Sequence, residues 1–211
     1  MIESIDNAIQ LLVTGGCACI AIYRAVCRND RMWALLSLFY GTFFLGDLYW
    51  YLYLVFFDSN PELYISEFSW YTSFLFLLLL LIYINVENSK GWRYRFRPLY
   101  MLIIAFTGTM CVFFIHVAED HISNIIAALL MTGLIWHACY GLQSIRKKPE
   151  GDNRRMLYLV TLLGCATEYA MWTSSCFWMG ETIFNIYYWF DFLLSACIVL
   201  LIPALGKAVA K

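Results

Sequence analysis

Three carboxylic acids interrupt segments of this sequence that are otherwise almost wholly apolar. Asp47 lies within "FFLGDLYWYLYLVFF" (43–57), Glu168 within "GCATEYAMW" (164–172) and Asp191 within "YYWFDFLL" (187–194). An ionisable side chain in an apolar environment is costly, so it usually has a partner, a proton or a functional role. We therefore treat these three acids as the first candidates for a functional site.

Aromatic residues lie one helical turn from each acid. Residues three or four apart share a helix face, and carboxylates bordered by aromatic rings favour cations, through charge and through the ring quadrupole. The predicted ligand-binding residues are Asp47, Trp50, Tyr51, Glu168, Trp172, Tyr188 and Asp191. No residue stands out as catalytic.

A simpler interpretation of the same residues stays open. Tyr and Trp form belts at membrane interfaces, which would account for Tyr64, Trp70, Trp178 and Tyr187. Acids near the middle of a bundle can also bond to hydroxyl groups and hold helices together without binding any ligand.

The composition places the chain in a bilayer. Of its 211 residues, 62% are hydrophobic and 14% are charged, whereas soluble domains are about half apolar and a quarter charged. Apolar segments of about 20 residues are long enough to cross a membrane as helices. The sequence predicts an all-α integral membrane protein, a single domain over residues 1–211 with seven transmembrane helices. The expected spans are 7–27, 32–57, 66–86, 98–117, 122–145, 155–178 and 183–205.

The basic residues predict the orientation. All 14 Lys and Arg lie in or beside the first, third and fifth connections or at the C-terminus. The second, fourth and sixth connections carry acids instead. Because Lys and Arg concentrate on the cytoplasmic side, we expect the N-terminus outside and the C-terminus in the cytoplasm.

The three acids are expected at a similar depth. Each lies ten residues from the predicted outer end of its helix, at Phe57, Trp178 and Glu181, which corresponds to roughly 15 Å. In a closed ring of seven helices, the second, sixth and seventh can be neighbours. We therefore expect the carboxyl groups to face the interior, and at least two of them to share a cavity that faces outward.

Several other chemistries have no support in the sequence. The eight cysteines contain no C-x-x-C pair, and the three histidines, His116, His121 and His137, do not form a ligand set. The last predicted helix has no lysine at its centre to anchor retinal. We expect neither a metal nor a cofactor, and a net charge of −1 gives no nucleic-acid signature.

Two stretches carry resemblances to known families. Residues 46–80, "GDLYWYLYLVFFDSNPELYISEFSWYTSFLFLLLL", resemble the multi-span sensor regions of bacterial signalling proteins that precede histidine kinase or diguanylate cyclase modules. "FLGDLYW" (44–50), with "GCATEYA" and "YYWFDFLL", is similar to segments of lysoplasmalogenase-type membrane hydrolases. The first resemblance implies sensing, and the second implies hydrolysis of a lipid headgroup bond.

The leading expectation is a sensor or receptor-like bundle in the bacterial inner membrane. It would bind a small cationic ligand in an acidic aromatic cavity and signal to a cytoplasmic partner. Membrane lipid is the other expected partner, and the basic connections could bind anionic headgroups. The alternatives are an intramembrane hydrolase that uses the buried acids, and a small proton-coupled transporter. A binding role is favoured over an enzymatic one.

Overall fold

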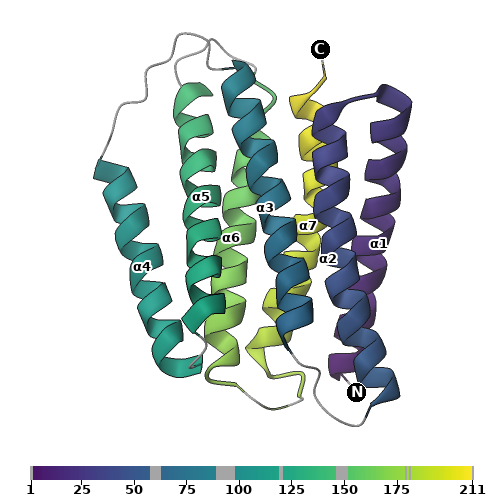
Figure 1. Ribbon diagram of the computed structural model, residues 1–211, viewed down its shortest axis with the longest axis vertical. Coiled ribbons are helices and arrows are strands. Elements are labelled where there is room, and N and C mark those ends of the chain that lie inside the picture. The colour runs from purple at the N-terminus through teal and green to yellow at the C-terminus, as the bar shows by residue number, and fades with distance from the viewer. Residues whose placement is uncertain are drawn as a thin grey trace.

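The computed structural model describes residues 2–57, 63–88, 98–118, 121–145, 152–178, 180 and 182–210 (Figure 1). Within these residues the chain forms seven α-helices and no strand. The helices are α1 (Ile2–Arg28), α2 (Arg31–Phe56), α3 (Leu63–Asn88), α4 (Pro98–Ala118), α5 (His121–Ile145), α6 (Arg155–Ser175) and α7 (Ile186–Ala208). The predicted all-α fold is confirmed, and most helix ends lie within three residues of the predicted spans.

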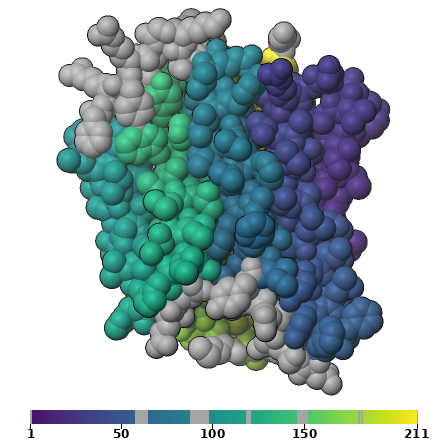
Figure 2. Space-filling model, in the orientation of Figure 1, coloured from purple at the N-terminus to yellow at the C-terminus, as the bar shows by residue number. Residues whose placement is uncertain are grey.

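Six of the helices are long and apolar enough to cross a membrane, and α6 is the exception. Every helix exposes large apolar side chains, such as Leu12 on α1, Phe68 on α3, Leu129 on α5 and Val199 on α7. The side chains of α2, α3, α4 and α5 pack into one continuous face in Figure 2. So much exposed apolar surface suits lipid and not water, so the structure agrees with a multi-pass membrane protein.

Consecutive helices run in opposite directions (Figure 1). We call the end of the bundle where α1 begins the N-terminal end, and the end where α7 finishes the C-terminal end. Helix packing closes a ring in the order α1, α2, α3, α5, α6, α7, while α4 lies outside this ring against α5. The expected closed ring of seven is therefore wrong. In the ring of six, α2 packs most closely on α1 and α3.

Short polar residues define two of the helix boundaries. Asn29 adopts a left-handed φ of 46° between α1 and α2, a conformation that Asn tolerates better than most residues. Asp30 then caps α2 by accepting from the Met32 amide at 2.8 Å. Asn185 caps α7 in the same way through the Tyr187 amide at 2.9 Å. This cap explains why α7 begins at Ile186, three residues after the predicted start.

The first helix begins five residues before the predicted span, at Ile2. The predicted first span began at residue 7 and so left Asp6 outside it, but the structure places Asp6 in α1 as a buried side chain, 3% exposed. Its burial follows from polar partners on α7, described below.

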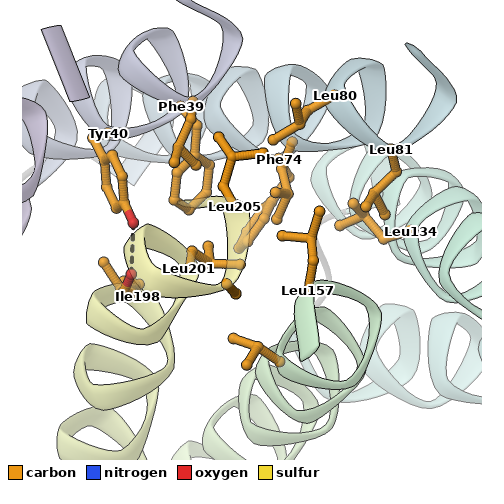
Figure 3. Packing of buried hydrophobic residues seen from close by; sticks show 14 of the residues in the cluster. Phe39, Tyr40, Phe74, Leu80, Leu81, Leu134, Leu157, Ile198, Leu201 and Leu205 are labelled. Carbon is orange, nitrogen blue, oxygen red and sulfur yellow. Dashed lines mark hydrogen bonds between the residues drawn. The ribbon is translucent and has the colours of Figure 1, made fainter. Parts of the chain in front are cut away.

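The two halves of the bundle differ in character. The half toward the C-terminal end is a packed apolar core around Phe39, Leu81, Leu134, Leu157 and Leu201 (Figure 3). In this half the Tyr40 hydroxyl donates to the Ile198 carbonyl at 2.6 Å and ties α2 to α7. The half toward the N-terminal end holds the three acids and a cavity.

Candidate functional site

A cavity of about 320 Å³ lies in the N-terminal half of the bundle, and all seven helices contribute to its lining. Its volume is at the lower end of the range for small-molecule sites. The charged or amide side chains that line it are Asn7, Gln10, Glu67, Asn124, Glu168 and Asp191. None of the described lining residues is Lys or Arg, so the carboxyl groups around the cavity are not balanced by a basic side chain in its lining.

Glu168 of α6 is the least satisfied of the acids. Its side chain is only 5% exposed and lines the cavity. Its Oε2 atom is buried and has no hydrogen-bond partner among the described residues. A buried carboxyl oxygen without a donor is costly, so Glu168 is the acid that would gain most from an additional partner.

Asp191 of α7 is held by α1. Gln10 Nε2 donates to its Oδ1 at 2.7 Å. Its carboxyl group also interacts with that of Asp6, and a hydrogen bond between two carboxyl groups requires at least one proton between them. Asp6 and Asp191 therefore form a carboxyl pair that joins α1 to α7 next to the cavity.

Asp47 of α2 lies behind the wall of the cavity and is not part of its lining. Trp70 Nε1 donates to its Oδ1 at 3.0 Å, and the Thr14 hydroxyl donates to its Oδ2 at 2.9 Å. Gly46 makes the first of these bonds possible, because a Cβ there would lie 2.8 Å from Trp70 Nε1. Asp47 thus positions an aromatic wall of the cavity.

Aromatic rings form most of that wall. Trp50 and Trp70 lie against each other with ring centroids 6.1 Å apart. On the opposite side, Trp172 packs edge-on against Phe114 at 6.0 Å. Tyr187 contributes from α7. Carboxyl groups and aromatic rings therefore line the same cavity.

The structure brings most of the predicted site residues together. Glu168 and Asp191 share the cavity, as expected for at least two of the acids, and Trp50 and Trp172 line it with them. Tyr51 and Tyr188 are not among the lining residues; Tyr187 takes the place expected for Tyr188. Tyr187 and Tyr188 lie four and three residues before Asp191. Only the rotation of α7 in the bundle decides which of them lines the cavity.

Sequence reasoning missed the contribution of α1. Asp6, Gln10 and Thr14 recur every four residues and form a polar stripe, which bonds to Asp191 and Asp47. Asn7 lines the cavity next to this stripe. The four-residue spacing within the first apolar segment was the available signal.

A second buried polar cluster lies near the C-terminal end. The Tyr158 hydroxyl donates to Asn85 Oδ1 at 2.7 Å, and Asn85 Nδ2 donates to the His137 carbonyl at 2.9 Å. His137 is thus a bonded interior residue that joins α5 to α3. Each of these bonds joins two helices of the ring, so the cluster holds α3, α5 and α6 together.

No family model, curated protein or solved structure matches this chain. Across the described residues, no three His, Cys, Asp or Glu side chains are placed to hold a metal ion. The chemistry of the cavity is therefore the basis for a functional assignment.

Proposed function

We propose that this protein is a membrane receptor for a small organic cation, which binds in the acidic aromatic cavity. The observation that carries the proposal is Glu168, which lines a cavity walled by Trp50, Trp70 and Trp172 and whose buried Oε2 has no hydrogen-bond partner among the described residues. A cation placed there would satisfy the carboxylate and lie against ring faces at the same time.

The aromatic walls favour an alkylammonium group over a hydrated metal ion. A cation within about 6 Å of a ring centroid gains roughly 0.5–2 kcal/mol per desolvated contact. Quaternary ammonium groups are weakly hydrated because they have no N–H donor, whereas metal ions require several oxygen or nitrogen ligands in a defined geometry. The size of the cavity, about 320 Å³, suits a ligand of choline size with room for a few waters.

The proposal includes the orientation and the route of the signal. Seven crossings, with the N-terminus outside, would direct the cavity toward the outer side and the basic residues toward the cytoplasm. Because α7 carries Asp191 and ends beside Lys207, a shift of α7 on ligand binding would reach the cytoplasmic surface. Because Gln10 of α1 donates to Asp191 of α7, α1 would move together with α7. A cytoplasmic signalling partner would then detect the new positions of these two helices.

Choline and 3,3-dimethylbutan-1-ol test this proposal, because they have nearly the same shape and differ in charge. Tryptophan fluorescence or calorimetry on the purified protein in nanodiscs is expected to show saturable choline binding, at least tenfold stronger than that of the neutral alcohol. Equal binding of the two compounds, or saturable binding of neither, would contradict the proposal.

Two variants locate the site. Glu168→Gln keeps the shape and removes the charge, so we expect choline to bind at least tenfold more weakly. Glu87→Gln is the matched control, because Glu87 is exposed on α3 near the C-terminal end. Trp172→Leu tests the ring without a change of charge, and Trp189→Leu, at a 58% exposed position, controls for the loss of an indole.

A further inference from the structure

A second, smaller cavity lies next to the first. Its volume is about 30 Å³. Phe43 of α2, Phe74 of α3 and Leu194 of α7 line both cavities. These three side chains therefore form a partition between them, which we call the floor of the site.

The floor lies deeper in the bundle than the acids. Leu194 follows Asp191 by three residues toward the C-terminal end, and Phe43 precedes Asp47 by four residues in the same direction. At 1.5 Å per residue these offsets correspond to roughly 5 Å. The rings of Phe43 and Phe74 meet edge-to-face, with centroids 6.1 Å apart, and Figure 3 shows Phe74 directed into the apolar core.

The smaller cavity is apolar on nearly all sides. Leu77, Leu134, Val160, Ile198 and Leu201 surround it. Its one hydroxyl, on Thr161, already donates to the Leu157 carbonyl at 2.9 Å. A water molecule needs two or more polar partners, so this space suits a hydrocarbon group better than water.

We propose that the ligand is an organic cation with a short alkyl chain, which binds with its charged head at Glu168 and Asp191 and its chain against the floor. In this arrangement Phe43, Phe74 and Leu194 set the longest chain that the site accepts. This inference rests on the proposed function, because it assigns the class of ligand for the same cavity.

A series of n-alkyltrimethylammonium ions, from methyl to hexyl, tests the inference on the full-length protein in nanodiscs. We expect binding to strengthen about fourfold with each methylene that the cavity buries, and then to level off or fall when the chain meets the floor. The Glu168→Gln protein in the same nanodiscs corrects for partition of the ions into lipid, since that partition does not depend on the carboxylate.

Opening the floor should lengthen the preferred chain. In Phe74→Ala the two cavities join, and we expect the optimum to move by at least two methylenes. Phe76→Ala, on the same helix at a position that lines neither cavity, should leave the optimum unchanged. If Phe74→Ala does not fold, Phe74→Leu removes less volume and should still move the optimum in the same direction.

The outcomes separate this inference from the function on which it rests. If tetramethylammonium binds but affinity does not rise with chain length, or the folded floor variant keeps the wild-type optimum, the inference is overturned and the receptor proposal stands. If no member of the series binds in a way that depends on Glu168, both fail.

Discussion

The indole nitrogen of Trp70 donates a hydrogen bond to Oδ1 of Asp47 over 3.0 Å. Asp47 therefore has a structural role, because its bond to Trp70 fixes the position of one ring in the cavity wall. The acid and the ring lie on adjacent helices, and the missing side chain of Gly46 lets them meet. The dipeptide Gly46-Asp47 therefore acts as one unit.

Gly46→Ala should disturb this unit. The new Cβ would lie 2.8 Å from Trp70 Nε1, so the indole must shift and its bond to Asp47 must weaken. We expect a loss of about 1–3 kcal/mol in the free energy of unfolding, measured by SDS titration in mixed micelles, and weaker choline binding. Gly41→Ala on the same helix meets nothing within 4 Å and should be neutral or stabilising, by up to about 1 kcal/mol. Equal effects of the two substitutions would refute this role for Gly46.

Gln10→Met should weaken the attachment of α1 to α7. It removes the donor that reaches Asp191 Oδ1 at 2.7 Å while it keeps the length of the side chain. Hydrogen bonds between membrane helices contribute about 0.6 kcal/mol on average and up to about 1.7. We expect a destabilisation of about 1–2 kcal/mol by the same titration, because the acceptor is a buried carboxyl group.

Gln143→Met is the matched control for that substitution. The Oε1 atom of Gln143 is buried and has no partner among the described residues. Its removal should therefore cost nothing or be slightly stabilising. If Gln10→Met is as harmless as this control, the bond between α1 and α7 contributes little to stability.

Gly141→Ala should be the most damaging glycine substitution in α5. A Cβ at Gly141 would overlap the ring of Tyr158, whose hydroxyl bonds to Asn85. We expect a loss of about 1–3 kcal/mol from overpacking and a lower melting temperature. Gly108→Ala on α4 meets nothing within 4 Å and should not lower it. A melting temperature that is unchanged in Gly141→Ala would show that Tyr158 can move aside at no cost.

The orientation can be tested with single cysteines in a variant without the eight native ones. Gly180 and Ala210 are exposed at opposite ends of the bundle. A maleimide that cannot cross membranes should label Gly180→Cys on intact cells, and Ala210→Cys only after the cells are opened. The reverse pattern would contradict the expected orientation, and labelling of both on intact cells would contradict a membrane crossing by α7.

Much of the fold could be predicted because it depends on local properties of the chain. Runs of apolar residues of membrane-spanning length, separated by polar breaks, were enough to place seven helices. The same contrast identified Asp47, Glu168 and Asp191 as candidate site residues, because an acid within an apolar segment can be recognised from the sequence alone. Their similar distance from the helix ends led to the prediction that at least two of them share a cavity, and Glu168 and Asp191 line the same one.

Which of these acids has hydrogen-bond partners depends on contacts between distant parts of the chain. Asp47 and Glu168 look alike in sequence, yet Trp70 and Thr14 satisfy Asp47, whereas Glu168 Oε2 stays without a partner. Asp6 lies just before the predicted first span, yet the fold places it against Asp191. The choice between Tyr187 and Tyr188 likewise depended on the rotation of α7 in the bundle.

The sequence by itself therefore determined that this chain forms apolar helices and which acids lie inside them, because hydropathy and helical spacing act over a few residues. Only the tertiary structure decided that six helices close a ring with α4 outside it, that α1 supplies polar partners to α2 and α7, and that Glu168 lines a cavity while its buried Oε2 has no partner among the described residues. Burial and hydrogen-bond satisfaction are properties of the packed bundle, since each depends on atoms that are far apart along the chain.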